Sequence, residues 1–215
     1  DIEAFFYKIK FPFTVGYGMT ECAPLISYDH HYEFVPTSCG SVLAGIMEAR
    51  IDSPDPENVP GEIQVRGENV MKGYYKNPEA TKAAFTKDGW LKTGDSGIMR
   101  GRRLFIKGRI KTMILGPSGQ NIYPEEIEAK LNNLPYVAES LVVERENKLV
   151  ALVYPDFAAL EASGLTAGQL PQIMDDNKGV LNKQVANYER ISSLIIVEKE
   201  FEKTPKKSIK RFLYN

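Results

Sequence analysis

The chain has 215 residues, and its 27 Lys and Arg residues against 28 Asp and Glu residues give a formal net charge of −1. At roughly 150 residues per domain this length predicts one large domain or two small ones, and the near-neutral charge argues against broad nucleic-acid binding, which needs a dominant phosphate-neutralising surface. Two cysteines are too few for a disulfide framework, which favours a reducing, cytoplasmic setting, and no run of residues reaches the ~20 apolar positions of a transmembrane segment.

The first half of the chain is predicted to consist mainly of short strands. An apolar segment, 5–15, is expected to form a strand or strand pair that leads into a glycine turn. Asn77 and Pro78 are typical of a helix cap and first turn, and the helix that they start would end near residue 88. Further strands are expected at 46–51, 61–66, 97–99 and 104–106. These short strands and the turns between them predict a small β-barrel-like subdomain over residues 1–109.

The second half of the chain shows helical as well as strand periodicity. Helices are expected at 124–132, where a proline and acidic residues stand at the start, and at 167–189, where apolar residues follow one stripe. Strands are expected at 138–143, at 148–154 after a turn at 146–147, and at 193–197. The predicted fold class is therefore α+β, with the β-rich part followed by a compact α+β domain at 110–215.

Residues 16–21, with the sequence Gly-Tyr-Gly-Met-Thr-Glu, are suited to a ligand-binding turn after the first predicted strand. Glycines such as Gly18 let the backbone approach a ligand closely, and Tyr17 offers a flat ring to a base. Thr20 offers a hydroxyl to a phosphate, and Glu21 offers a hard oxygen ligand to magnesium. The alternative from these residues alone is an ordinary glycine turn with Tyr17 packed in the core.

Other charged side chains are also suited to a nucleotide. Asp95 follows a glycine, and its carboxylate can accept hydrogen bonds from two neighbouring hydroxyls, as on a ribose; the alternative is a turn aspartate at a strand end. Arg109 has a planar fork suited to phosphate or sugar oxygens, and Lys111 follows at the predicted domain junction, with a solvated strand end as the alternative. The basic tail, 203–211, offers mobile ammonium groups to a phosphate, or serves as a solubilising tail or a nonspecific polyanion patch.

Taken together and in this order, these strings resemble the adenylate-forming superfamily, which includes acyl-CoA synthetases, luciferases and the adenylation domains of peptide synthetases. The string 17–21 is similar to the nucleotide motif of that family, and its later blocks are matched in order by 61–81, 92–95, 108–128 and the tail. The resemblance implies a two-step ligase, in which a carboxylate attacks the α-phosphate of ATP, pyrophosphate leaves, and a thiol, usually that of CoA, then displaces AMP. ATP, Mg and CoA are the cofactors that it implies.

The resemblance also implies roles for residues in the first half of the chain. Tyr17, beside Gly18, would pack on the adenine. Thr20 would contact the phosphate, and Glu21 would bind magnesium. Asp95 would accept hydrogen bonds from both ribose hydroxyls.

Roles around the domain junction follow from the same resemblance. Arg109 would also reach the ribose or a phosphate, and Lys111 stands at the hinge position, near 109–111, where the small C-terminal domain of the family rotates between the two half-reactions. Gly119 would lie in the loop that lines the pantetheine channel after the rotation.

The catalytic lysine of the family has no direct counterpart in this tail. Aligning residues 203–209 with the family string places Ser208 where the lysine should be, and serine cannot supply a positive charge. Lys207, one residue earlier, is the preferred substitute, with Lys206 as the alternative and Lys210 further along.

The chain also lacks the Ser/Thr/Gly-rich phosphate loop and most of the acyl pocket of the family. It is therefore expected to be the C-terminal portion of a longer ligase, one that folds but does not form acyl-adenylate by itself. Apolar side chains that neighbouring segments would otherwise cover would then be exposed, or paired in a homodimer; these are Phe5, Phe6, Ile9 and Phe11.

The acid substrate is predicted from two further strings. Residues 119–128 and 209–212 look most like those of fatty acyl-CoA synthetases, long-chain ones included. Aryl-CoA ligases and peptide-synthetase adenylation domains share the same blocks and remain alternatives. A non-catalytic homologue that binds a nucleotide or a partner is a further alternative, because Ser208 replaces the expected lysine. The expected partners are small molecules, not nucleic acid.

Overall fold

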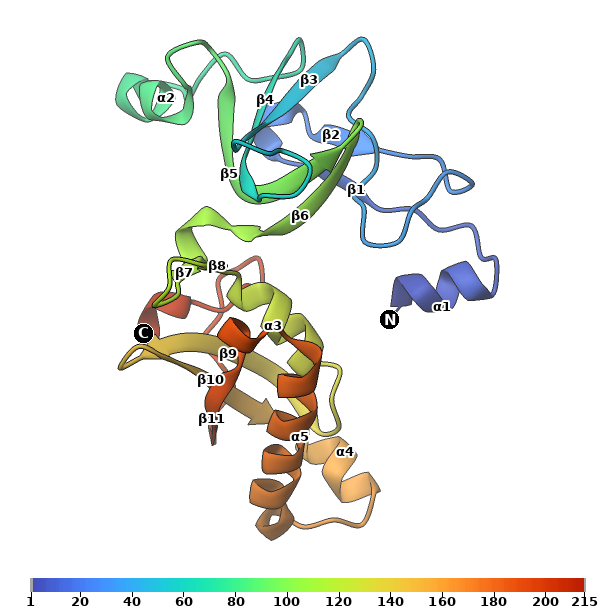
Figure 1. The fold of residues 1–215 in the computed structure, drawn as a ribbon, viewed down its shortest axis with the longest axis vertical. Coiled ribbons are helices and arrows are strands. Elements are labelled where there is room, and N and C mark those ends of the chain that lie inside the picture. The colour runs from blue at the N-terminus through green and yellow to red at the C-terminus, as the bar shows by residue number, and fades with distance from the viewer. Residues whose placement is uncertain (1, 215) are drawn as a thin grey trace. The chain divides into compact units, whose positions relative to one another are not determined.

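The computed structural model describes residues 2–214 of the chain, which divides into two compact units, Asp1–Lys111 and Thr112–Asn215, named unit 1 and unit 2 (Figure 1). Both units combine helices with sheets, so the fold class is mixed α/β. Among residues 2–214, no helix is both long enough and apolar enough to cross a bilayer.

Unit 1 is built on an antiparallel sheet with the strand order β3-β4-β5-β6. Its strands are β3 (Met47–Asp52), β4 (Gly61–Gly67), β5 (Leu91–Arg100) and β6 (Arg103–Arg109), and a separate ladder joins β1 (Gly16–Gly18) to β2 (Leu25–Tyr28). The remaining elements are α1 (Ile2–Lys8), the 3₁₀ turn η1 (Thr20–Cys22) and α2 (Pro78–Ala84). One core is shared by η1 and the strands of both sheets, and its most deeply buried side chains are Cys22, Ile26, Ile63, Val65, Leu91 and Leu104.

The barrel-like subdomain expected from the short strands does not form. The larger sheet is open, with β3 and β6 at its ends, and the bridges Ser41–Arg103 and Ser27–Val42 only extend it from β6 towards β2. A barrel needs continuous pairing around its whole circumference. In the described part of the chain no ladder joins β3 to β1, so the sheet stays unclosed.

The apolar start of the chain is helical, so the strand predicted over 5–15 is wrong. The ring of Phe6 in α1 lies 4.9 Å from that of Phe11 and 5.0 Å from that of Phe13, measured between centroids. These contacts between residues close in the sequence bury part of the segment without a partner strand. The helix itself has no buried residue, and several of its apolar side chains are exposed, as the sequence led us to expect.

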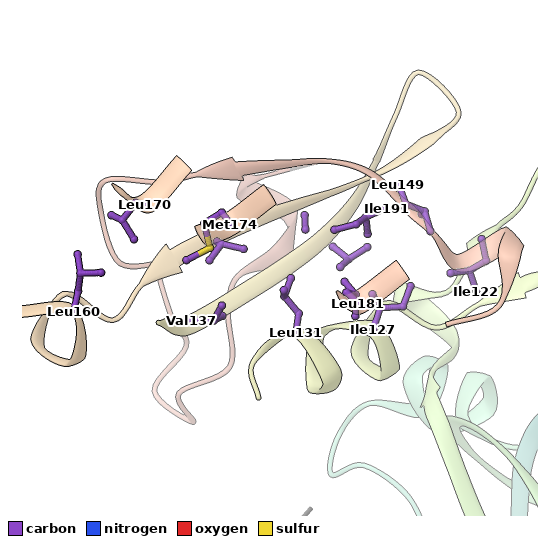
Figure 2. Packing of buried hydrophobic residues seen from close by; sticks show 13 residues of the cluster. Ile122, Ile127, Leu131, Val137, Leu149, Leu160, Leu170, Met174, Leu181 and Ile191 are labelled. Atoms are coloured by element: carbon purple, nitrogen blue, oxygen red, sulfur yellow. The ribbon is translucent and has the colours of Figure 1, made fainter. Parts of the chain in front are cut away.

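Unit 2 places α3 and α5 against a three-stranded sheet with the order β11-β10-β9, in which β9 is antiparallel and β11 parallel to β10. Its elements are β7 (Ile114–Leu115), β8 (Asn121–Ile122), α3 (Pro124–Leu131), β9 (Val137–Arg145), β10 (Lys148–Pro155), α4 (Phe157–Ala162), α5 (Leu170–Gln184) and β11 (Ile191–Ile196). Figure 2 shows the core between the helices and the sheet, with Ile127 and Leu131 of α3, Met174 and Leu181 of α5, and Val137, Leu149 and Ile191 of the strands. This side of the sheet is the first face.

The second face of this sheet is also apolar and is covered by the tail of the chain. Its buried strand residues are Leu141, Val143, Val150 and Leu152. Phe201 is buried in the same cluster, and Ile209 and Tyr214 pack against it. Because both faces are covered, β10 is apolar over residues 149–153, and β9 is apolar over its central residues, 141–143. The tail therefore belongs to the fold of unit 2.

Two predicted helices are shorter than the sequence suggested. The range 167–189 divides into a 3₁₀ turn (Ala167–Gln169), α5 and a second 3₁₀ turn (Asn187–Glu189). After α5 the chain returns to β11, and the Asn182 side chain binds both the N–H and the C=O of Ile191 there. The helix α2 ends early because Phe85 bridges to Leu91 at the start of β5.

Candidate functional site

Side chains far apart in the sequence meet in unit 1. The hydroxyl of Tyr17 in β1 donates to Asp95 Oδ2 at 2.6 Å, and Arg109 Nε lies 2.9 Å from Asp95 Oδ1. Asp95 is 5% exposed and Tyr17 is 8% exposed, whereas the side chain of Arg109 is 63% exposed. The result is a buried carboxylate held between a phenol and a guanidinium group that reaches the surface.

The pairing of β5 with β6 explains this arrangement, because it sets Asp95 directly opposite Arg109. The register shifts just beyond this pair, between residues 96 and 97, which is typical of a β-bulge beside a functional site. Thr93 Oγ1 accepts from the backbone N–H of Asp95 at 3.1 Å and donates to the carbonyl of Ile63 at 2.8 Å. The backbone that carries the carboxylate is therefore fixed by the neighbouring strand as well.

The electrostatics of this group keep Tyr17 protonated. Burial, together with the hydrogen bond to the Asp95 carboxylate, raises the pKa of the Tyr17 phenol well above its usual range. The phenol is thus a permanent donor near neutral pH. Each carboxylate oxygen has two lone pairs, so Tyr17 and Arg109 together leave one acceptor position on each oxygen of Asp95.

The ring of Tyr17 lies in the core of unit 1, as the glycine-turn alternative predicted. A ring that is only 8% exposed offers little of its face to a base. Sequence reasoning did not find the contact between the Tyr17 hydroxyl and Asp95, because nothing in two segments 78 residues apart shows that they pair.

Thr20 and Glu21 lie in η1, where Thr20 is exposed and Glu21 is half-buried. The hydroxyl of Tyr74 donates to Glu21 Oε1 at 3.0 Å, and the backbone N–H of Met71 donates to the Glu21 carbonyl at 2.7 Å. Tyr74 is a site residue that sequence reasoning missed. The available signal was the string Gly-Tyr-Tyr at 73–75, which lies within the block 61–81 that resembles the family.

Position 18 requires a glycine because another segment of the chain passes close to it. A Cβ at this position would lie 2.2 Å from the carbonyl oxygen of Pro24. The same carbonyl accepts a hydrogen bond from the N–H of Met19 at 2.8 Å, which closes the turn around η1. The close approach therefore positions Thr20 and Glu21.

The carboxylate of Glu21 is suited to supply one oxygen ligand to a magnesium ion. Magnesium takes oxygen ligands, keeps several waters and is commonly held by one or two carboxylates plus substrate phosphates. Within residues 2–214, no group of three or more His, Cys, Asp and Glu side chains is arranged to hold a metal. Glu21 could therefore supply one ligand, with the others coming from phosphate and water.

The candidate lysines of unit 2 stand at the tip of a small hairpin turn, which we name the lysine turn (residues 203–209). Lys203 pairs with Ile209 at its base, and the N–H of Thr204 donates to the Ser208 carbonyl at 2.8 Å. Lys206 and Lys207 are exposed, and within the described residues neither ammonium group has a hydrogen bond or ion pair. Their charges are therefore available to an anion.

Ser208 is exposed beside these lysines, and Lys207 has a φ of +61°, so the backbone turns sharply at this point. Gly119, the other predicted site residue of unit 2, lies in an exposed turn with a φ of +82°. A groove of about 300 Å³ adjoins that turn and is lined in part by Gln120, Tyr188 and Arg190. Lys111 is exposed in the 3₁₀ turn Ile110–Thr112, at the end of unit 1.

Residues 2–75 match the AMP-binding enzyme family. The matched range includes the β1–η1 turn, with Tyr17, Thr20 and Glu21, and also Tyr74. Asp95, Arg109 and the lysine turn lie beyond it.

Over most of its length, the chain is similar to plant 4-coumarate–CoA ligases. The chain is 36% identical over 195 residues to 4-coumarate–CoA ligase 5 from Oryza sativa subsp. japonica, which covers 85% of this chain and 34% of the relative. It is 35% identical over 204 residues to 4-coumarate–CoA ligase 4 from Arabidopsis thaliana, covering 89% of this chain and 34% of the relative. The chain thus spans about a third of the length of these curated relatives.

Solved structures of adenylating enzymes share the fold. O-succinylbenzoate coenzyme A synthetase from Bacillus subtilis, in complex with AMP, matches with a TM-score of 0.77 and 27% identity over 98% of this chain and 42% of that chain. ATP-bound MatB from Rhodopseudomonas palustris matches with a TM-score of 0.69 and 28% identity over 92% of this chain and 39% of that chain. The first of these structures holds AMP and the second holds ATP.

Proposed function

We propose that this chain works in an ATP-dependent acid–CoA ligase that proceeds through an acyl-adenylate. The observation that carries the proposal is the buried Asp95 carboxylate, which keeps one acceptor position on each oxygen beside the exposed guanidinium group of Arg109. A carboxylate in this state can accept from two adjacent ribose hydroxyls. The match of residues 2–75 to AMP-binding enzymes supports the same ligand.

In the first half-reaction, a carboxylate oxygen of the acid would form a bond to the α-phosphorus of ATP while the bond to the bridging oxygen breaks and pyrophosphate leaves. Asp95 would hold the ribose, and the hydroxyl of Thr20 would contact the phosphate. Glu21 would hold magnesium, which neutralises phosphate charge when bound. Lys207, or Lys206, would bring a positive charge to the oxygens on which charge develops, since electrostatic stabilisation supplies most of the catalysis in such a transfer.

In the second half-reaction, the thiol of CoA would attack the acyl carbon, AMP would leave, and the thiol proton would pass to solvent or to a base. The hinge proposed near 109–111 lies where unit 1 ends, at Lys111. Gly119 and its exposed turn belong to unit 2, and we propose that they face the pantetheine arm of CoA in this step.

For the acid, we propose an aromatic carboxylate of the 4-coumarate type as the first candidate. The names of the two plant relatives support this choice, since both are 4-coumarate–CoA ligases. The fatty acid that the sequence strings favoured is the second candidate.

Nucleotide binding by this chain is the first test. ATP and AMP are titrated into the chain and followed by NMR at the Asp95 amide. We expect Asp95→Asn to weaken binding by about tenfold, or roughly 1.4 kcal/mol, because the amide keeps one acceptor oxygen and loses one hydrogen bond to the ribose. Glu79→Gln is the matched control, because Glu79 is an exposed carboxylate in α2. Equal affinities of the wild-type protein and Asp95→Asn would refute the ribose role.

Catalysis is the second test. A protein that contains this chain within the full length of its relatives is supplied with a panel of aromatic and fatty acids, and pyrophosphate release is measured. Release with aromatic acids supports the proposal, and release with fatty acids only selects the second candidate. ATP binding without release for any acid would favour the non-catalytic homologue. The 215-residue chain by itself is expected to show no ATP–pyrophosphate exchange.

A further inference from the structure

Glu128 is a carboxylate inside unit 2, and its residue is only 8% exposed. It projects from α3, and its Oε1 accepts a hydrogen bond from the backbone N–H of Val142 in β9 at 2.6 Å. Burial raises the pKa of this carboxyl, while the hydrogen bond and the charge of Arg211 oppose that rise. A buried carboxylate is tolerated only where charged and hydrogen-bonding partners compensate for the lost water.

Arg211 is that compensating partner, and it comes from the tail. Its two terminal nitrogens lie 2.9 Å from Glu128 Oε2 and 2.8 Å from Oε1, and one of them also donates to the Val142 carbonyl at 2.9 Å. The guanidinium group therefore binds α3 and the unpaired edge of β9 at once. A bidentate pair of this kind fixes orientation as well as distance.

This pair stands directly beside the lysine turn. Arg211 follows the turn by two residues, and Lys210, between them, donates its N–H to the Glu202 carbonyl at 2.8 Å. On the other side of the turn, Lys203 Nζ lies 2.5 Å from Glu139 Oε1 in β9. Both ends of the turn are thus anchored to β9, while Lys206 and Lys207 at its tip are exposed.

The two anchors differ in kind. Lys203 and Glu139 are each about a quarter exposed, and a lysine ammonium imposes no plane on its partner. Arg211 and Glu128 are more deeply buried and bind through two parallel contacts. Since the direction in which the tip points depends on the orientation of the chain at its base, the buried bidentate pair is the stronger constraint.

We propose that the Arg211–Glu128 ion pair is a positioning element that holds the lysine turn in one orientation on unit 2. The inference rests on the proposed function, because a fixed orientation matters only if the tip lysines act on a phosphate. Arg211 and Glu128 touch no substrate in this scheme. They act through Lys206 and Lys207.

Hydrogen exchange of individual amides in the 215-residue chain tests the positioning. The reporters are the N–H groups of Thr204, Lys207 and Lys210, which are bonded across the turn, and the reference is the set of amides in β10. We expect Arg211→Gln and Glu128→Gln each to speed exchange in the turn by at least about tenfold relative to β10, because the local opening becomes easier.

Two further variants keep the result interpretable. Lys210→Gln removes an exposed ion pair with Glu202 and should leave exchange in the turn within about twofold of wild type. Arg211→Lys keeps the positive charge but loses the planar guanidinium group, so exchange in the turn should be faster than in wild type and slower than in Arg211→Gln. If Arg211→Gln does not fold, the exchange rates of Arg211→Lys test the proposal in its place. Unchanged exchange in the turn would overturn the proposal. An equal acceleration of turn and β10 amides would also overturn it, since that is the result of a purely stabilising pair.

A second readout separates this inference from the proposed function. ATP is titrated into the same proteins and followed at the amides of Lys207 and Asp95. We expect Arg211→Gln to weaken the response at Lys207 by about fivefold or more and to leave that at Asp95 unchanged, because only the turn loses its orientation. An equal response at Lys207 in both proteins would overturn positioning. No response of the wild-type protein at either amide would refute the proposed function, while the exchange data would still decide the role of the pair.

Discussion

Tyr17→Phe isolates the hydrogen bond between the Tyr17 hydroxyl and Asp95. The ring stays, so the packing in the core of unit 1 is kept, and only the 2.6 Å contact to Asp95 Oδ2 is lost. Hydrogen bonds to charged groups contribute roughly 1.5–3 kcal/mol, and the loss is felt in full where the acceptor is buried. Because the phenylalanine ring would still fill the core position of Tyr17, water cannot easily take the place of the lost hydroxyl. We expect unit 1 to lose about 2 kcal/mol of unfolding free energy.

Trp90 makes this loss measurable in one unit. It is the single tryptophan of the chain, it lies in unit 1, and it is 9% exposed, so its fluorescence reports the unfolding of that unit. With a urea dependence of about 2 kcal/mol/M, a loss of about 2 kcal/mol lowers the unfolding midpoint by roughly 1 M.

The control is Tyr75→Phe, which removes a hydroxyl from a residue that is 88% exposed and should leave the midpoint unchanged. A midpoint for Tyr17→Phe within about 0.2 M of wild type would mean that the hydroxyl does not hold Asp95. The candidate ribose site would then lack the donor that orients Asp95.

Three further substitutions test the local physics. Gly18→Ala places a Cβ 2.2 Å from the carbonyl oxygen of Pro24, so the Trp90 signal should show a loss of roughly 1–3 kcal/mol, and an unchanged midpoint would contradict the close approach. Gly179→Ala fills open space in α5 and should stabilise unit 2 by about 0.5–1 kcal/mol, seen as a higher melting temperature by circular dichroism; a lower one would contradict it. Burial raises the pKa of the Asp29 carboxyl, but hydrogen bonds from Arg103 and Ser41 outweigh burial and lower this pKa overall. The charged carboxylate therefore stabilises unit 1 above about pH 4, and this stabilisation is lost as the pH falls through the lowered pKa. The stability difference between wild type and Asp29→Asn in unit 1 should therefore shrink in acid, and a constant difference would refute this linkage.

Elements with a local signal were predicted well from the sequence. The side chain of Asn77 caps α2 by accepting from the N–H of Ala80 at 3.0 Å, and Pro124 begins α3, both as predicted. The turn predicted at 146–147 is present, with positive φ at both residues. Caps and tight turns depend on interactions within a few residues, so the sequence specifies them directly.

Features that depend on distant partners were not predictable in the same way. The segment 5–15 has the apolar composition of a strand, but its aromatic rings pack on one another and on α1. The motifs that contain Tyr17, Asp95 and Arg109 were found by resemblance, yet their meeting depends on the register of β5 with β6 and on the shared core. Register is set by packing over the whole sheet, so no single motif reveals it.

The second face of the unit 2 sheet has a practical consequence for shortened versions of this protein. The residues from Phe201 onward cover Leu141, Val143, Val150 and Leu152, so a chain that stops before Phe201 would present that apolar surface to water. A contiguous patch of this type favours self-association. Removing the tail to delete its lysines would thus change the colloidal behaviour of the molecule, whereas substituting Lys206 or Lys207 singly would leave the covering layer in place.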